Sequence, residues 1–294
     1  MLASSSAAQT GDNGRVVSRP LPSSLSPARR SPDRPLILAH RGGRALGPEN
    51  TIPAFDLGLA AGADGLELDV HVSADDVAVV CHDATLDRTT DATGPIAART
   101  AAELAALDAT RRYGVDLEHV WTGPRAGIPT LEEVLRRYPD VPVVIEMKAA
   151  SRRAAEAVVR AVRATGAVGR VCVGSFSRDA LRAVRGIAPE IATSASQPET
   201  RWALYRSWIG LAPRRPPYQA FQVPERAGGH TVVSPRFLRA VHRANLALQV
   251  WTVNDPADMR RLLDWGVDGL ITDCPDVGVR VRDEWVAARG SAVG

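Results

Sequence analysis

The sequence predicts an α/β protein, a (β/α)8 barrel (TIM barrel) with a hairpin or loop insertion after the second strand. From residue 35 onward, short apolar runs alternate with helical patterns through eight repeats. Eight such units over about 250 residues match the length and rhythm of this barrel. The alternative fold is a doubly wound open sheet, which would place its polar residues at the one point where the strand order reverses. Here polar residues follow many of the apolar runs, which favours the barrel.

The predicted strands are short runs rich in aliphatic residues. They cover residues 36–40, 65–70, 142–147, 171–175, 191–194, 220–223, 247–252 and 268–272. The helical patterns that follow them cover residues 50–61, 130–137, 152–165, 177–187, 198–208, 234–244, 256–265 and 276–287. Three helices carry a start signal, because Pro235, Pro256 and Pro275 stand at or near the first helical position, where a missing N–H costs nothing.

Two strand-to-helix connections are long, and in a barrel both would lie on the catalytic face. Residues 71–129 contain the apolar run VAVVCHD, which we expect to form a hairpin beside the barrel mouth. Residues 224–233 form the second, and it carries His230. Residues 209–219 join a helix to a strand, so we expect them, and the apolar run 201–211 that they overlap, on the opposite face.

Composition indicates one globular domain over residues 35–294, preceded by a disordered tail over residues 1–34 that is rich in Ser, Pro, Arg and Gly. The net charge of +3 does not favour nucleic-acid binding. We recognise no signal peptide and no transmembrane segment. Three cysteines without a CxxC motif favour a reduced, cytoplasmic setting. The sequence does not indicate an oligomeric state.

Carboxylates gather at two strand ends. Glu67 and Asp69 are two residues apart on the second strand, so they face the same side, and Glu146 ends the third. Three converging carboxylates would repel one another unless they take up protons or hold a cation. Hard oxygen ligands without a thiolate favour Mg²⁺ or Ca²⁺ over Zn²⁺.

Basic groups surround these carboxylates. Arg41 follows the first strand, and Lys148, the single lysine of the chain, follows the third. With a metal they would make an electropositive pocket that suits phosphate recognition and phosphoryl transfer. His40 and His82 could then divide the acid and base roles that phosphodiester cleavage needs.

Some polar residues also have structural interpretations. His71 has the same parity as Glu67 and Asp69, which would allow a metal role, but we expect the strand to be leaving the barrel there. For Asp273 we expect capping of the helix that follows. Trp251 would suit plain packing at the barrel rim.

The motifs together resemble the glycerophosphodiester phosphodiesterase family. The run from 39 to 90 contains AHRG, PENTIPAF and GADGLELDVHVSADDVAVVCHDATLDRTT. IPTLEEVL (128–135), IEMK (145–148), GSF (174–176), VWTVND (250–255) and GLITDCP (269–275) follow in the order of the family. The resemblance covers residues 36–280.

The resemblance implies a metal-dependent hydrolase that converts glycerophosphodiesters to glycerol 3-phosphate and an alcohol. It makes His40 and His82 the acid–base pair and Glu67, Asp69 and Glu146 the ligands of one divalent cation, Mg²⁺ or Ca²⁺, with Mn²⁺ a further candidate. Other residues have binding or supporting roles in this assignment. Arg41 and Lys148 contact the phosphate, Trp251 packs on the glycerol side, Glu49 binds the metal or orients Arg41, and Asn50 and Phe176 support the site.

Two alternatives follow from the same residues. A lysophospholipase D-like or phosphoinositide-directed relative would need an apolar channel, and the expected position of residues 201–211 opposite the mouth argues against one. A catalytically silent barrel that binds a phosphorylated ligand would have lost members of the His or acid set, and none is missing. Neither the attacking oxygen, from water or from the glycerol 2-hydroxyl, nor the assignment of acid and base follows from the sequence.

Overall fold

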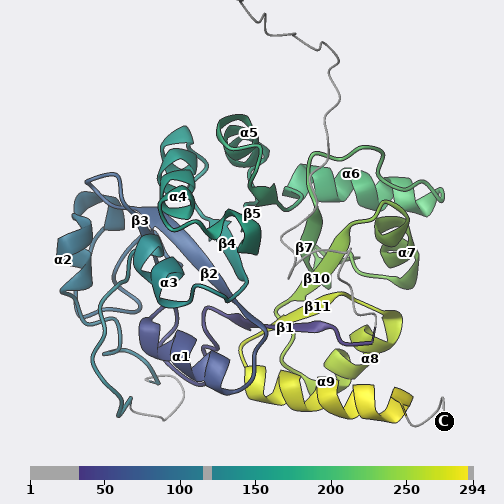
Figure 1. Ribbon diagram of the computed structural model, residues 1–294, viewed down its shortest axis with the longest axis horizontal. Coiled ribbons are helices and arrows are strands. Elements are labelled where there is room, and N and C mark those ends of the chain that lie inside the picture. Colours follow the sequence, from purple (N-terminus) through teal and green to yellow (C-terminus); the bar gives the residue numbers. More distant parts are fainter. Residues whose placement is uncertain (1–32, 115–120, 291–294) are drawn as a thin grey trace, which may run out of the picture.

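Eight parallel strands form the centre of the molecule in the computed structural model, which describes residues 33–114 and 121–290 (Figure 1). They are β1 (Leu36–His40), β2 (Gly65–Val72), β4 (Val143–Met147), β5 (Val171–Gly174), β6 (Ala192–Thr193), β7 (Ala220–Pro224), β10 (Ala247–Trp251) and β11 (Gly269–Thr272). Their spatial order is β6-β5-β4-β2-β1-β11-β10-β7. The predicted barrel is confirmed, with every predicted strand present.

The two ends of this sheet, β6 and β7, meet and nearly close the ring. A parallel bridge joins Ser194 to Ala220. Two backbone hydrogen bonds support it, from Gln219 N–H to the Thr193 carbonyl at 3.0 Å and from Ala195 N–H to the Ala220 carbonyl at 2.8 Å. Closure removes the open edges that an unpaired sheet would expose.

The inward-facing rows of the strands change from apolar to polar toward their carboxyl ends. One buried cluster fills the barrel with a residue from each of seven strands: Leu38, Val144, Cys172, Ala192, Ala220, Ala247 and Ile271. Two residues further along, the same rows carry His40, Glu146 and Asp273. Because side chains alternate between the two sides of a strand, the inward-facing residues at the carboxyl ends of these strands are polar, and they form the base of the site.

Helices cover the outside of the ring. They are α1 (Ile52–Ala60), α3 (Leu131–Arg137), α4 (Arg152–Ala164), α5 (Arg178–Ile187), α6 (Gln197–Trp208), α7 (Pro235–Arg243), α8 (Pro256–Trp265) and α9 (Pro275–Gly290). The outward rows of the strands pack against them, as with Leu68 and Ile145 on one half of the barrel and Phe221 and Leu248 on the other. The helices match the predicted patterns to within about two residues at most ends.

Two insertions lie on the loops after β2 and β7. The strand β3 (Ala78–Val80) pairs antiparallel with the end of β2, which confirms the predicted hairpin. The short helices η2 (Ile96–Ala98) and α2 (Ala101–Ala105) follow it. After β7, β8 (Arg226–Ala227) and β9 (His230–Thr231) form a second hairpin, and a further short helix, η3 (Ala167–Arg170), precedes β5.

Two predictions concern parts of the chain beyond the barrel. The tail predicted over residues 1–34 lies, apart from its last two residues, outside the described residues. In the described ranges, no helix combines the length and the apolar composition that a bilayer span requires.

Candidate active site

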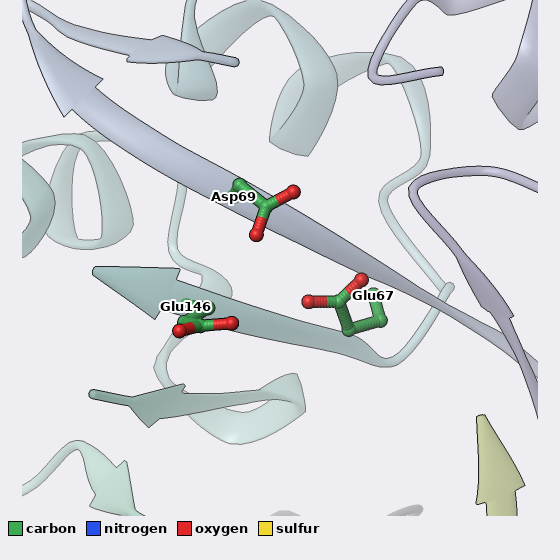
Figure 2. A group of neighbouring side chains, drawn as sticks. All are labelled: Glu67, Asp69 and Glu146. Carbon is green, nitrogen blue, oxygen red and sulfur yellow. The ribbon is translucent and has the colours of Figure 1, made fainter. Parts of the chain in front are cut away.

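Three carboxylates converge at the carboxyl ends of β2 and β4, as Figure 2 shows. Glu67 and Asp69 come from β2 and Glu146 comes from β4, where the register pairs Asp69 with Glu146. One oxygen from each lies within 4.8 Å of the others. Glu67 and Asp69 are buried, so the charges that they carry are poorly solvated and require nearby compensation.

Two basic side chains supply part of that compensation. The Lys148 ammonium lies 2.8 Å from Asp69 Oδ1 and 3.0 Å from Glu146 Oε2. Arg41 Nε lies 3.3 Å from Asp69 Oδ2. Burial alone would raise the pKa of Asp69, but the charges of Lys148 and Arg41 lower it on balance. Burial and the charge of Asp69 raise the pKa of Glu67 to about 8.

The donor set suits a divalent cation. The three carboxylates outnumber Lys148 and Arg41, the two basic groups beside them, and burial together with the charge of Asp69 raises the pKa of Glu67 to about 8, so that it retains a proton near neutrality. Glu146 Oε1 is buried and has no hydrogen-bond partner among the described residues. A hard cation would satisfy that oxygen and replace the proton, and oxygen donors are those that Mg²⁺ and Ca²⁺ prefer.

Asn50 and Glu49, at the start of the connection to α1, hold two members of the site. Asn50 Nδ2 donates to Asp69 Oδ2 at 2.9 Å. Glu49 accepts a hydrogen bond from Arg41 Nη1 at 2.9 Å. The Glu49 contacts are those of a residue that orients Arg41, one of the two roles considered for it.

The turn after β1 aims His40 and Arg41 into the barrel mouth. Arg41 adopts a left-handed conformation with φ of 51°, and Gly42 follows with φ of 88°. A Cβ on Gly42 would lie 2.9 Å from backbone atoms of Ala54 and Phe55. The chain therefore needs glycine at position 42, both for its backbone angle and for its close approach to α1.

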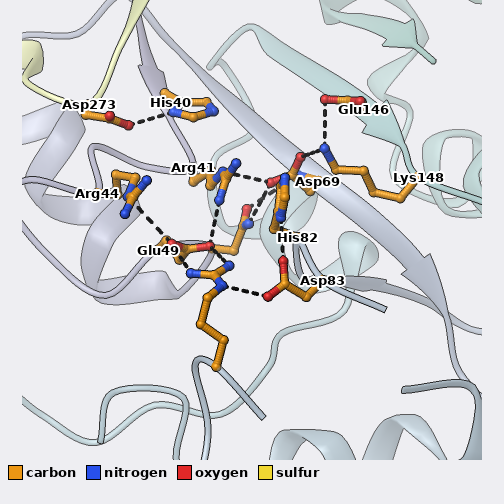
Figure 3. A network of polar contacts seen from close by, with 12 residues as sticks. His40, Arg41, Arg44, Glu49, Asp69, His82, Asp83, Glu146, Lys148 and Asp273 are labelled. Atoms are coloured by element: carbon orange, nitrogen blue, oxygen red, sulfur yellow. Dashed lines mark hydrogen bonds and ion pairs between the residues drawn. The ribbon is translucent and has the colours of Figure 1, made fainter. Parts of the chain in front are cut away.

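The His40 ring is held by residues that follow β10 and β11. His40 Nδ1 lies 2.6 Å from Asp273 Oδ1 (Figure 3), and Asn254 Nδ2 donates to Asp273 Oδ2 at 2.8 Å. Burial alone would lower the pKa of His40, but the hydrogen bond to Asp273 and the charge of Glu67 raise it on balance. The expectation that Asp273 caps α9 was therefore wrong, because both of its carboxylate oxygens are engaged by His40 and Asn254.

His82 is held in a parallel way from the loop after β3. Its Nδ1 lies 2.6 Å from Asp83 Oδ1. Arg88 donates through Nε to Asp83 Oδ2 at 2.6 Å and through both terminal nitrogens to Glu49, at 2.9 and 2.7 Å. A continuous chain of ion pairs thus links Arg41, by way of Glu49 and Arg88, to the carboxylate that holds His82.

His71 lies behind this segment. Its Nε2 is 3.0 Å from the backbone carbonyl oxygen of His82 and donates to it, since a carbonyl only accepts. Burial lowers the pKa of His71. The ring therefore supports the His82 backbone, and this nitrogen is not directed at the carboxylate cluster.

One cavity of about 520 Å³ opens at the barrel mouth and brings most of the predicted site residues together. The predicted residues that line it are His40, Arg41, Glu67, His82, Glu146, Lys148, Phe176 and Trp251. Asp69, Glu49 and Asn50 support this set from behind through the contacts described above. Phe176 and Trp251 meet edge to face, with ring centroids 5.9 Å apart.

The position expected for residues 201–211, on the face opposite the mouth, was wrong. Arg201, Leu204, Tyr205 and Trp208 of α6 line the same cavity as His40 and His82. The end of α6 also lies near the start of α7, where Arg236 Nη1 donates to the Trp208 carbonyl at 3.2 Å. The helix therefore passes along the catalytic side of the barrel, and His230 of the second hairpin reaches the same cavity.

Sequence reasoning missed the roles of Asp83, Arg88 and the Asp273 carboxylate. The adjacency of His82 and Asp83 was the available signal for one histidine–carboxylate pair. Asp273 and His40 are 233 positions apart, and Arg88 and Glu49 are 39 positions apart. No local pattern predicts such pairs, because they form only when the ring of strands closes.

The chain is similar to known phosphodiesterases over nearly all of its described length. The model of the glycerophosphoryl diester phosphodiesterase family matches residues 40–277. A glycerophosphodiester phosphodiesterase from Caldanaerobacter subterraneus is 32% identical over 82% of this chain and 95% of the relative. A probable glycerophosphodiester phosphodiesterase 2 from Mycobacterium tuberculosis is 33% identical over 86% and 94%.

A solved structure shows the same likeness. The crystal structure of a glycerophosphoryl diester phosphodiesterase homologue from Silicibacter pomeroyi superposes with a TM-score of 0.74 at 28% identity, over 89% of this chain and 97% of the other.

Proposed function

Because the chain belongs to the glycerophosphoryl diester phosphodiesterase family and is a phosphoric diester hydrolase, we propose that it cleaves glycerophosphodiesters with one divalent cation and two histidines. The products are glycerol 3-phosphate and an alcohol. The observation that supports this most is the convergence, in one cavity, of the carboxylate cluster with two imidazoles that each contact a carboxylate through Nδ1.

Glu67, Asp69 and Glu146 hold the cation in this proposal. The family is generally dependent on divalent metals, and the unpartnered Glu146 Oε1 and the raised pKa of Glu67 both favour such an ion. Mg²⁺ or Ca²⁺ suits the oxygen set, with Mn²⁺ as a third candidate. The ion supplies positive charge that offsets charge developing on the phosphoryl oxygens.

Arg41 and Lys148 bind the nonbridging phosphate oxygens. Both line the cavity. Glu49 fixes the Arg41 guanidinium through Nη1 at 2.9 Å, and Asp69 lies 3.3 Å from Nε, so the charged group is held at the cavity where a phosphate would bind. A preorganised charged donor costs little reorganisation when charge increases in the transition state.

His40 and His82 transfer the protons. With Nδ1 on a carboxylate, each ring has Nε2 as its remaining nitrogen, and both rings line the cavity. One imidazole accepts the proton of the attacking oxygen, and the other donates a proton to the departing alkoxide. The attacking oxygen comes from water or from the glycerol 2-hydroxyl, and a substrate without that hydroxyl would be cleaved only by the first route.

Trp251 and Phe176 pack on the glycerol side, supported by their edge-to-face contact within the cavity. The substrate is a small molecule. Cys81, Cys172 and Cys274 are free thiols, which favours the reducing cytoplasm as the compartment.

The assay that tests the function supplies glycerophosphocholine, glycerophosphoethanolamine, glycerophosphoglycerol and glycerophosphoinositol, and measures glycerol 3-phosphate. We expect turnover of at least one substrate with Mg²⁺, Ca²⁺ or Mn²⁺ and its loss on thorough chelation. Activity that survives chelation would remove the metal from the proposal. Failure to turn over any substrate with any of the three ions would contradict the function.

A further inference from the structure

The cavity has a polar side and an apolar side, and these lie across the barrel from each other. The carboxylates and His40 come from β1, β2 and β4. In the ring order, β6 stands four strands from β1 and three from β2, and β7 stands three strands from β1 and four from β2, which places both on the opposite wall. The helix that follows β6 and the hairpin that follows β7 therefore face the catalytic groups across the mouth.

Apolar side chains outnumber polar ones on that opposite wall, whose uncharged polar members are Ser194, Gln197, Thr200 and Gln222. The apolar residues that line it are Leu204, Tyr205, Trp208, Val223, Ala227 and Val232. Its ionisable members, Arg201 and His230, are exposed. Tyr205 and Trp208 lie against each other, with ring centroids 5.0 Å apart, and thus present a continuous aromatic face to the cavity.

The helix that carries this wall, with the residues directly after it, exposes most of the large apolar side chains of the described residues; Tyr205 and Trp208 of this set line the cavity, whereas Trp202, Ile209 and Leu211 do not. Seven are exposed, and five of these fall within residues 202–211, while a sixth, Phe176, lines the same cavity. Single exposed apolar residues are ordinary, but a contiguous set beside a cavity marks a binding surface. Glycerol is polar and leaves this surface without a matching partner, and a choline headgroup, whose quaternary ammonium binds aromatic faces, would match only the Tyr205 and Trp208 rings and not the aliphatic part of the wall.

We propose that the apolar wall, which we name the α6 wall, binds one hydrocarbon chain of the substrate. The substrate class is then a glycerophosphodiester that carries a single chain, on the glycerol or on the other alcohol. This inference rests on the function proposed above and deepens it. The reaction is unchanged: a bond forms from phosphorus to the attacking oxygen, the bond to the departing alcohol breaks, and that alcohol takes up a proton.

Continuity with the catalytic groups favours a substrate chain over a membrane as the occupant. Leu204 is buried, whereas Tyr205 and Trp208 are half exposed, so the wall runs from the interior of the cavity outward. A bilayer would contact exposed side chains of the helix whether or not they line the cavity. Trp202, which is 64% exposed and is not among the lining residues, provides a test of that difference.

The experiment measures kcat/KM for two substrate series at concentrations where every compound is monomeric. One series runs from glycerophosphocholine through its 1-butanoyl to 1-decanoyl derivatives. The other runs from glycerophosphobutanol to glycerophosphodecanol. We expect kcat/KM to rise by about twofold to fourfold per methylene in one series until the wall is covered, because each methylene is removed from water. The series that rises identifies the alcohol that carries the chain.

A matched pair of variants locates the effect. Trp208→Gln should reduce the dependence of kcat/KM on chain length by at least half. Trp202→Gln removes the same side chain from the same helix and should leave that dependence unchanged. Equal effects of both variants on binding to phosphatidylcholine vesicles, with no dependence on chain length for monomers, would make the surface a membrane contact and overturn the proposal.

The outcomes separate this inference from the proposed function. Turnover of glycerophosphocholine with kcat/KM constant within twofold across both series would show that the α6 wall does not bind a hydrocarbon chain. The proposed function would still hold. If no compound is turned over, calorimetry with butyl- to decylphosphocholine tests the wall alone. Affinity that rises with chain length and falls in Trp208→Gln would uphold the wall, and affinity independent of length would overturn it.

Discussion

At the scale of single residues, the contacts between carboxylates and basic side chains define the site. His40 and His82 are each held by an aspartate at 2.6 Å. The two aspartates come from different parts of the chain, one beyond β11 and the other directly after His82. In the proposed acid–base mechanism, this arrangement orients each ring and favours the tautomer with hydrogen on Nδ1 before substrate binds.

The first prediction concerns Asp273. Asp273→Asn should lower kcat by about 10-fold to 1000-fold, because an amide can present N–H to His40 Nδ1 and favour the wrong tautomer. The thermal midpoint should change by only a few degrees. Asp276→Asn, at an exposed position three residues further on, is the control. Turnover by Asp273→Asn within twofold of the wild type would show that the pair does not position His40.

The second prediction concerns Glu49. Burial alone would raise its pKa, but Arg88 and Arg41 lower it from 4.5 to about 2. A lowered carboxyl pKa contributes stability that is present above pH 4.5 and is lost as the pH falls through that value toward about 2. Wild type should therefore exceed Glu49→Gln in free energy of unfolding by at most about 3 kcal/mol at neutral pH.

That difference should shrink as the pH falls below about 4.5, and denaturant titrations at several pH values would measure it. A difference that stays constant between pH 7 and pH 3 would mean that the Glu49 charge does not stabilise the fold.

At the scale of elements, the strands were predictable because each is a short apolar run that ends in a polar residue. The parity of Glu67 and Asp69 on β2 and the place of Glu146 on β4 then predict the carboxylate cluster without tertiary information. The direction of α6 was not predictable. The helical pattern over residues 198–208 predicts the helix, but that the helix lines the barrel mouth depends on its packing against neighbouring elements such as α7.

The third prediction concerns the turn between β1 and α1. Gly42→Ala should destabilise the protein by about 2–4 kcal/mol, because it adds a clash with the α1 backbone to the strain of a positive φ. Gly94→Ala is a matched control, since Gly94 has φ of 90° and a Cβ added there would meet no atom within 4 Å. It should cost only about 1 kcal/mol.

Chemical denaturation of both variants would measure the difference. Equal losses in the free energy of unfolding at the two positions would show that the close approach between the turn after β1 and α1 does not constrain the fold.

At the scale of the whole molecule, closure of the barrel assembles the site. Four strands are neighbours along the ring: β11, β1, β2 and β4. They bring Asp273, His40, Glu67 and Glu146 to one mouth, although these four residues span more than 230 positions of sequence. The same closure sets the α6 wall opposite them. Sequence patterns predict the members on strand ends, whereas contacts between loops, such as that of Arg88 with Glu49, depend on the closed fold.

Different residues hold the metal and transfer the protons in the proposed mechanism, and this gives the fourth prediction. Glu146→Gln should weaken the thermal stabilisation by a divalent cation, because a neutral amide is a poorer ligand for a hard cation. A cation at about 100 times its dissociation constant contributes about 2.7 kcal/mol to the wild type. That corresponds to a rise in Tm of about 5–10 °C for a domain of this size.

The most direct test measures glycerophosphocholine turnover and the metal-induced rise in Tm side by side in wild type, His82→Ala and Glu146→Gln. We predict both properties in the wild type, the Tm rise without turnover in His82→Ala, and a reduced rise with reduced turnover in Glu146→Gln. Near-normal turnover by His82→Ala, or an undiminished Tm rise in Glu146→Gln, would contradict the proposed mechanism.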